Sequence, residues 1–272
     1  MEKEALACLA TLGHPGRMAL FRLLMRRYPD AVRAGELSQA LSIKPSTLSM
    51  HLAALAQDGL IAQTREGTAR LYRIQMDRVQ WLMDYLFADC CRGRVDLCPI
   101  RPDAAPPRKF NVLFICTGNS ARSIFAEAIL RAEAGDRFIV HSAGTRQNSQ
   151  LNPLAVEMLK AKGHDITPLR AKNVDEFRGP GAPEMDFVFT VCDQAANEEC
   201  PAWEGQPVTA HWGVPDPVKA TGSLAERRLA FQQAYGLLRN RIRAFAALPL
   251  ETQDRIARQT AVDRIATMEG LQ

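Results

Sequence analysis

The chain has 272 residues, of which 47% are hydrophobic and 24% are charged. This composition is that of a folded globular protein, and it excludes the disordered, collagen-like and disulfide-knot classes. The length indicates two domains. The longest apolar run, residues 112–116, is far shorter than the roughly 18 residues that a membrane-spanning helix needs, and Glu2 and Glu4 stand where a signal peptide requires basic residues. We therefore predict a cytoplasmic protein without membrane contact.

The charge divides at a proline-rich seam. Residues 1–109 contain 16 basic and 11 acidic side chains, a net charge of +5, whereas residues 110–272 contain 18 and 19, a net charge of −1. Residues 99–109 include four prolines, which cannot continue a helix. We predict one domain over residues 1–98, a spacer over 99–109, a second domain over 110–250 and a helical tail over 251–272. The basic surplus of the first part permits nucleic-acid binding.

The first domain has the pattern of an α+β winged helix-turn-helix. Helical spacing predicts helices over residues 3–12, 15–27, 34–41, 45–57 and 76–90, and residues 60–63 and 69–74 form a predicted hairpin. The helix over 45–57 would enter the DNA major groove. The side chains expected to contact DNA are Ser46, Thr47, Ser49 and His51 on that helix, with Arg65 and Arg70 in the hairpin. The alternative for Ser46 and Thr47 is helix capping alone.

Residues 36–38, the run Ser46 to Leu55 and the closing Asp58-Gly59-Leu60-Ile61 resemble the ArsR/SmtB family of metal- and metalloid-responsive repressors. The resemblance implies a homodimer joined through its first and last helices, so residues 76–90 would form part of the dimer contact. It also implies release of operator DNA when a thiophilic ion binds.

Three of the seven cysteines, Cys90, Cys91 and Cys98, lie close together at the end of this domain. Three thiolates suit trivalent arsenic or antimony, and Gly93 offers a turn between them. Arsenite is therefore the expected inducer. A zinc site lacks a fourth ligand nearby, and three unrelated thiols at a helix end remain the alternative. Cys8 is expected to pack in the first helix.

After the seam, strands alternate with helices. The predicted strands are residues 110–116, 138–142, 187–192 and 208–212, and the predicted helices are 120–134, 152–162 and 224–248. This alternation indicates an α/β domain with a four-stranded parallel sheet.

Between the first strand and helix of that domain, Cys116 is followed by five residues and Arg122. Backbone N–H groups of such a loop converge on a tetrahedral oxyanion and activate the cysteine, and the guanidinium offers a two-pronged contact. The remaining loop residues predicted to cradle the oxyanion are Thr117, Gly118, Asn119, Ser120, Ala121 and Ser123.

This loop, residues 141–145 and Asp216-Pro217 resemble the low-molecular-weight tyrosine phosphatases and their arsenate-reductase branch. The resemblance implies that Cys116 is the nucleophile, Arg122 the oxyanion clamp and Asp216 the general acid. It also implies that Asn119, Ser123 and Ser142 hold the loop in shape. Asp216 could instead be a turn residue before proline.

The reductase branch implies further thiols, because reduction of arsenate consumes two electrons. Cys192 and Cys200 would supply them, first as a Cys116–Cys192 disulfide and then as Cys192–Cys200, with residues 193–199 polar and mobile enough to bring the sulfurs together. No tightly bound cofactor is expected. An external thiol reductant would reopen the disulfide, with thioredoxin favoured over glutaredoxin. The alternative is that Cys192 is a buried structural thiol and Cys200 is incidental.

Phosphatases of this fold carry an aromatic pair after Asp-Pro, whereas this chain has Val218-Lys219. We therefore expect an arsenic-responsive repressor fused to a thiol-dependent arsenate reductase, with arsenate and operator DNA as its ligands. Two alternatives stay open: a purely regulatory DNA-binding protein whose second domain senses an oxyanion, and a protein tyrosine phosphatase fused to a DNA reader.

Overall fold

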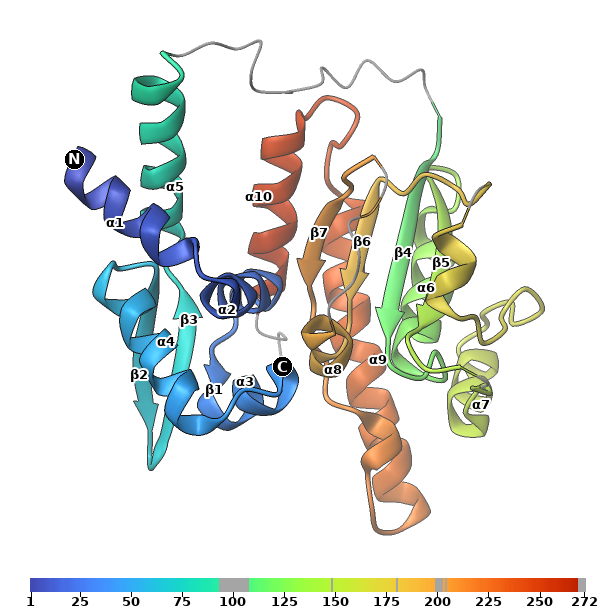
Figure 1. Ribbon diagram of the computed structural model, residues 1–272. Coiled ribbons are helices and arrows are strands. Elements are labelled where there is room, and N and C mark those ends of the chain that lie inside the picture. Colours follow the sequence, from blue (N-terminus) through green and yellow to red (C-terminus); the bar gives the residue numbers. More distant parts are fainter. Residues whose placement is uncertain (93–107, 148, 180, 199–202, 204, 269–272) are drawn as a thin grey trace. The chain divides into compact units, whose positions relative to one another are not determined.

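A computed structural model describes residues 1–92, 108–147, 149–179, 181–198, 203 and 205–268 (Figure 1). Two predicted functional cysteines, Cys98 and Cys200, lie outside the described residues, as does most of the predicted spacer. The chain forms two compact units, Met1–Pro102 and Asp103–Gln272.

The first unit is a winged helix-turn-helix, as predicted. Its helices are α1 (Glu2–Leu12), α2 (Pro15–Arg26), α3 (Ala34–Leu41), α4 (Pro45–Gln57) and α5 (Met76–Tyr85). The wing consists of β2 (Ile61–Glu66) and β3 (Ala69–Ile74), which pair antiparallel, and the sheet order is β1-β3-β2. β1 (Val32–Arg33) was not predicted, because two residues are too few to show an alternating pattern.

Leucines at helical spacing build the core of this unit. Leu48, Leu52 and Leu55 form the buried face of α4, opposite Leu20 and Leu24 of α2. Ser42 ends α3 in the left-handed conformation, with φ 51°. Pro45 then starts α4, where its missing N–H costs no hydrogen bond.

The predicted last helix of the first unit, residues 76–90, is α-helical only in its first part. The α-helix ends at Tyr85, and a π-helical turn, η1 (Leu86–Cys90), follows it directly. The backbone N–H of Cys91 donates to the Leu86 carbonyl, 2.9 Å from nitrogen to oxygen, five residues back. Such turns occur frequently at functional sites, and this one carries Cys90 and leads into Cys91.

The second unit contains the predicted four-stranded parallel sheet. Its strands are β4 (Phe110–Cys116), β5 (Phe138–Gly144), β6 (Phe187–Thr190) and β7 (Val208–His211), in the order β5-β4-β6-β7. Every neighbouring pair is parallel. Consequently all four carboxyl ends meet at the lower edge of the sheet in Figure 1, where Cys116 lies opposite Gly144 in the register.

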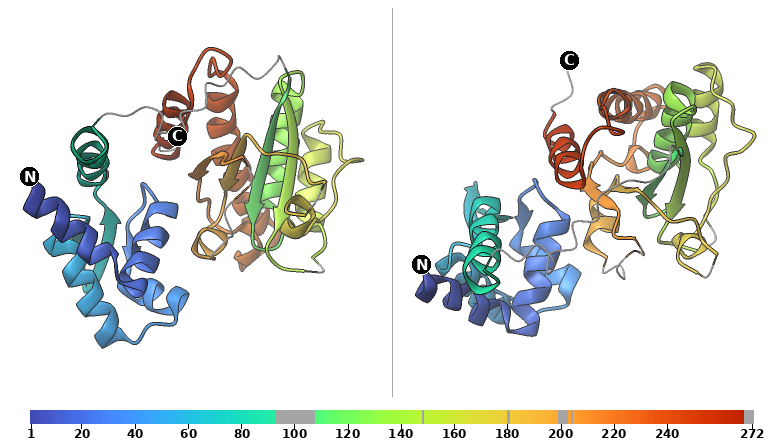
Figure 2. Two further views of the ribbon diagram at one scale, coloured as in Figure 1. Left: turned by 45° about the horizontal axis from the view of Figure 1, so that its top comes forward. Right: turned by 90° about the horizontal axis from the view of Figure 1, so that it is seen from above.

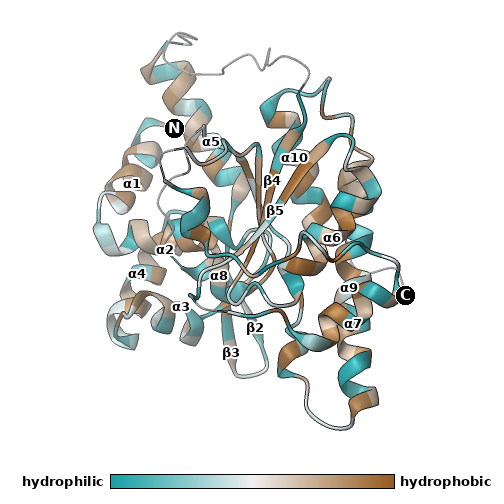
Figure 3. Cartoon of the chain, turned by 90° about the vertical axis from the view of Figure 1, so that its right-hand side faces the viewer, coloured by the Kyte–Doolittle hydropathy of each residue, from teal (hydrophilic) through white to brown (hydrophobic). Residues whose placement is uncertain are grey.

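Helices cover this sheet. Figures 1 and 2 show α6 (Arg122–Ala134) and α9 (Leu224–Ala246) side by side on one face, with α7 (Pro153–Ala161) next to them. Figure 3 draws most of β4 and β5 in the brown of hydrophobic residues, and the central strand β4 is buried from Val112 to Cys116. None of the helices in the part of the chain that the structure describes is both long and apolar enough to cross a membrane.

The C-terminal tail forms helix α10 (Arg255–Ala266) and protects the edge of the sheet. The side-chain amide of Gln259 accepts a hydrogen bond from the Thr209 N–H at 3.3 Å and donates to the Thr209 carbonyl at 2.7 Å. The indole N–H of Trp212 donates to the Val262 carbonyl at 3.2 Å. The helix therefore occupies backbone groups of β7 that an exposed edge strand would offer to another chain.

The expected mobile stretch after Cys192 is partly helical. Within residues 193–198, α8 (Asp193–Asn197) forms one short helix, and Ala195 and Ala196 are buried. Two adjacent alanines give no recognisable amphipathic period, so the sequence did not reveal this helix.

Two 3₁₀ turns, η3 (Val174–Phe177) and η4 (Pro217–Lys219), were not predicted either, because such short segments show no period in the sequence. The helix predicted from residue 120 begins at Arg122, which leaves residues 117–121 as a loop.

We predict that Trp212→Phe lowers the free energy of unfolding of the second unit by about 1–3 kcal/mol. Trp212 is fully buried and stacks on Phe189, with 3.9 Å between ring centroids, so the change creates a cavity and removes the bond to α10. Urea denaturation followed by circular dichroism measures the change. Ile256→Ala, on an α10 side chain that is 66% exposed, is the control, and equal effects of the two variants would contradict the role of Trp212.

Candidate active site

Cys116 ends β4 at the start of the loop, and hydrogen-bond donors face its sulfur. The backbone N–H of Asn119 donates to Sγ at 3.1 Å, and the Ser123 hydroxyl oxygen lies 2.9 Å from Sγ. The cysteine is only 3% exposed. Donors aimed at a buried sulfur suit a nucleophilic thiolate.

The loop is held by the side chain of Asn119. This residue is fully buried and has a left-handed backbone with φ 43°. Its amide donates to the hydroxyls of Ser123, at 2.9 Å, and Ser142, at 2.8 Å, and its carbonyl oxygen accepts from the Lys172 N–H at 2.7 Å. The side chain thus ties the loop to α6, to β5 and to the segment before η3.

A buried ion pair lies behind Asn119. The ammonium of Lys172 lies 3.0 Å from Oε2 of Glu127, and both side chains are less than a tenth exposed. Ser142 donates to the same carboxylate, and Arg131 pairs with its other oxygen. We did not predict Glu127 or Lys172 as site residues. The sequence did offer one signal for Glu127, which is a charged residue inside the mostly apolar run 123–130. In the structure this whole run is buried.

The predicted segment 141–145 supports the loop from β5. The Thr145 N–H donates to the Cys116 carbonyl at 3.1 Å, and the Arg146 N–H donates to the Thr117 carbonyl at 2.9 Å. Gly144 permits this approach, because a Cβ there would lie 2.9 Å from both the Asn119 nitrogen and the Thr117 carbonyl oxygen. Any other residue would displace the loop.

Arg122 and Asp216 meet although they are far apart in the sequence. The guanidinium lies 2.9 Å from Oδ2 of Asp216 and also donates to the Val214 carbonyl at 3.1 Å. Asp216 accepts from the Val218 N–H at 3.2 Å through its other oxygen. Asp216 therefore stabilises the turn that follows it, in line with the alternative of a turn residue. Its carboxylate also contacts Arg122, the predicted oxyanion clamp.

Cys192 follows β6 and faces the same loop. Its sulfur lies 3.4 Å from the Thr117 hydroxyl oxygen, and the residue is 2% exposed. Burial raises the pKa of the Cys192 thiol, and negative charge on Cys116 raises it further, while Arg122 opposes both effects. Both cysteines are free thiols. The structure thus brings together Cys116, Arg122, Asp216 and Cys192, whereas the predicted Cys200 lies outside the described residues.

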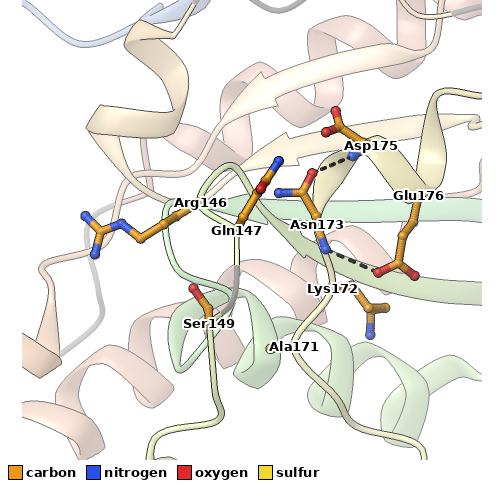
Figure 4. Close-up of a pocket in the computed structure, with 8 residues that line it drawn as sticks. All are labelled: Arg146, Gln147, Ser149, Ala171, Lys172, Asn173, Asp175 and Glu176. Atoms are coloured by element: carbon orange, nitrogen blue, oxygen red, sulfur yellow. Dashed lines mark hydrogen bonds between the residues drawn. The ribbon is translucent and has the colours of Figure 1, made fainter.

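A pocket of about 450 Å³ lies beside the loop (Figure 4). Figure 4 shows two stretches of chain contributing its side chains; these are Arg146, Gln147, Ser149, Ala171, Lys172, Asn173, Asp175 and Glu176. Cys116, Arg122, Cys192 and Asp216 do not line it. The pocket borders the loop at Gly118, where an added Cβ would lie 3.9 Å from the Ser149 hydroxyl oxygen, and it is not the reactive centre.

The predicted DNA-contacting residues lie on α4 and the wing. Ser46, Arg65 and Arg70 are exposed, and Thr47 is half-buried. The N-cap of α4 is Lys44, without a side-chain capping bond, so the capping alternative for Ser46 and Thr47 is wrong.

Two of these predicted residues make contacts within the unit. The exposed Ser49 donates its hydroxyl hydrogen to the Pro45 carbonyl at 2.9 Å. His51 is half-buried, and its ring centroid lies 4.7 Å from that of His14. Burial lowers the pKa of His51, helped by His14 and Arg17.

The predicted metalloid ligands stand at the end of α5. Cys90 is exposed and Cys91 is half-buried, while Cys98 lies outside the described residues. Cys8 is buried in α1, as predicted, and its thiol donates to the Asp58 carbonyl, with 3.6 Å between sulfur and oxygen.

Sequence comparison finds similarity in both units. Residues 111–260 match the family described as low molecular weight phosphotyrosine protein phosphatase, and residues 12–64 match a helix-turn-helix domain. The arsenate reductases of Halalkalibacterium halodurans and Bacillus subtilis are each 36% identical over 135 residues, which is 50% of this chain and 94% of theirs. A solved structure of an arsenate reductase in the oxidized state is 27% identical, with TM-score 0.40, and covers 49% of this chain and 96% of its own.

We predict that Lys172→Met destabilises the second unit by about 2–4 kcal/mol, because it leaves Glu127 buried with Arg131 as its remaining cation. The double variant Glu127→Gln with Lys172→Met removes both charges, so it should recover at least half of the loss. Thermal and urea unfolding of the two variants provide the measurement. If the double variant is as unstable as the single one, packing rather than charge explains the effect.

Proposed function

The chain belongs to the low molecular weight phosphotyrosine protein phosphatase family, and from this premise we propose that its second unit reduces arsenate to arsenite. The helix-turn-helix unit acts as an operator-bound repressor that this arsenite releases. The arsenate reductases that match nearly their whole length to the second unit support the substrate.

One observation carries the choice of reduction over hydrolysis. Cys192 places a second buried thiol at the loop, 3.4 Å from the Thr117 hydroxyl. Hydrolysis of a phosphate ester by this loop needs one cysteine, whereas reduction of arsenic(V) needs two thiols to supply two electrons. A protein tyrosine phosphatase is the second candidate, because Cys116, Arg122 and Asp216 alone would serve it. The half-exposed Val218 after Asp216 offers no aromatic face to a phenyl ring.

In the first step, the Cys116 thiolate attacks arsenic and forms a sulfur–arsenic(V) bond. One arsenate oxygen departs as water, with Asp216 supplying a proton. Arg122 and the N–H groups of the loop bind the remaining oxygens, where they stabilise the developing charge.

In the second step, the Cys192 thiolate attacks the sulfur of Cys116. The electron pair of the sulfur–arsenic bond stays on arsenic, which leaves as arsenite, and a Cys116–Cys192 disulfide forms. Cys200 then attacks Cys192, which frees the Cys116 thiolate and leaves a Cys192–Cys200 disulfide. An external dithiol protein, thioredoxin or glutaredoxin, returns the two electrons, so the cycle needs no tightly bound cofactor.

The sensor half of the proposal concerns Cys90, Cys91 and Cys98. Arsenite bound by three thiolates would alter the end of α5, the helix expected to join two copies of the chain into a homodimer. The exposure of Cys90 and the π turn that carries it support this site.

We predict that Cys192→Ala lowers arsenate turnover at least about a hundredfold, because no second thiol remains to break the sulfur–arsenic bond. The measurement is arsenate-dependent NADPH oxidation with thioredoxin and thioredoxin reductase, repeated with a glutaredoxin system. Hydrolysis of para-nitrophenyl phosphate is the control and should persist, since it uses Cys116, Arg122 and Asp216. Undiminished arsenate turnover in the variant would exclude the second step.

We also predict that arsenate plus reductant releases DNA from the wild-type protein and not from Cys116→Ala, whereas added arsenite releases DNA from both. The probe is a duplex that the protein itself selects from a random library, and fluorescence anisotropy reports release. Equal release of the two proteins by arsenate would show that the enzyme does not generate the inducer.

A further inference from the structure

The residue after Cys192 makes a contact that the proposed reaction does not use. Asp193 is the first residue of α8, and its Oδ1 lies 3.1 Å from Nε2 of His211. The Asp193 side chain is 57% exposed, whereas the His211 side chain is fully buried. The exposed carboxylate of Asp193, next to Cys192 in the chain, therefore contacts the buried imidazole of His211.

The imidazole is itself fixed to the sheet. His211 ends β7, opposite Thr190 at the end of β6, and its Nδ1 lies 2.9 Å from the Thr190 hydroxyl oxygen. Both ring nitrogens are therefore occupied, Nδ1 by the Thr190 hydroxyl and Nε2 by the Asp193 carboxylate. The start of α8 is thus connected to two strands of the sheet.

The chain after His211 is shaped around this pair. A Cβ on Gly213 would lie 2.8 Å from Nε2 of His211 and 3.0 Å from Oδ1 of Asp193, so no side chain fits there. The next residue, Val214, receives the hydrogen bond from Arg122. One short segment therefore contacts both the oxyanion clamp and the anchor of α8.

α8 needs such an anchor because five residues make little more than one helical turn, which is unstable in isolation. At its other end, the Thr145 hydroxyl donates to Oε1 of Glu198 at 3.1 Å. The backbone N–H of Thr145 also donates to the Cys116 carbonyl. Both ends of the helix are therefore held by side chains against the end of the sheet that carries the loop.

We propose that Asp193 and His211 are positioning residues that keep the Cys192 sulfur buried at the Cys116 loop. Without the pair, α8 detaches at its first residue, and Cys192 spends less time within reach of Cys116. The kinetic consequence rests on the proposed reductase function, whereas the protection of the Cys192 thiol does not.

The first test measures that protection in the full-length reduced protein. Alkylation of Cys192 by iodoacetamide, followed by mass spectrometry, should be about tenfold faster in Asp193→Ala than in wild type, because the thiol reacts when α8 opens. Asp193→Asn retains an oxygen acceptor for Nε2 and should stay close to wild type. Gln194→Ala, the neighbouring exposed residue of α8, is the matched control.

Two outcomes of this test overturn the proposal. Unchanged labelling in Asp193→Ala shows that the pair does not hold Cys192, and equally fast labelling in Gln194→Ala shows that any change in α8 exposes it. Because Asp193 is exposed, the variant should fold normally, and its circular dichroism and melting temperature check this. In His211→Asn, which replaces the imidazole by a shorter side chain, Cys192 should be alkylated as fast as in Asp193→Ala.

The second test separates positioning from binding. Asp193→Ala should lower kcat for arsenate about tenfold with KM unchanged, and it should leave para-nitrophenyl phosphate hydrolysis intact, since that reaction does not need Cys192. A raised KM, or an equal loss in both reactions, would contradict a role limited to Cys192. If wild type turns over no arsenate, the proposed function fails while the labelling experiment still decides the anchor.

Discussion

The loop that follows Cys116 depends on one buried amide. The Asn119 backbone N–H can point at the Cys116 sulfur only while the residue keeps its left-handed conformation. Three hydrogen bonds of the Asn119 side chain hold it there. A buried polar group without partners is costly, so each partner of Asn119 must in turn be satisfied. That requirement accounts for the Glu127–Lys172 pair behind Ser142 and extends the support of one loop into α6 and β5.

The parallel sheet brings the other residues of the candidate site to this loop. Because all four strands end at one edge, the segments after β4, β6 and β7 converge there although up to a hundred residues separate them. β4 contributes Cys116, β6 leads into Cys192, and the segment after β7 brings Asp216 to Arg122. Two thiols with different surroundings result: one faces hydrogen-bond donors, and the other lies in a buried position that raises its pKa.

Residues that form patterns in the sequence were predictable, and residues that act through tertiary contacts were not. Cys116 and Arg122 follow from their fixed spacing between a strand and a helix, and the strands of the parallel sheet follow from their apolar runs. Lys172 and Glu127 are 45 residues apart, and nothing in their local sequence marks them as partners. α8, β1 and the π turn are too short to have a period, and only packing against the rest of the fold stabilises them.

The two surroundings impose an order on the proposed reaction. Burial and the negative charge of Cys116 both raise the pKa of Cys192, so negative charge on the Cys116 sulfur disfavours a second thiolate at Cys192. Formation of the sulfur–arsenic bond moves that charge from the Cys116 sulfur to oxygens held by Arg122 and the loop N–H groups. One of the two causes is thereby removed, and Cys192 becomes easier to deprotonate once there is an adduct to attack. The Cys116–Cys192 disulfide therefore forms only from this adduct, because joining two thiols removes two electrons and arsenic(V) is the group that accepts them in the proposed reaction.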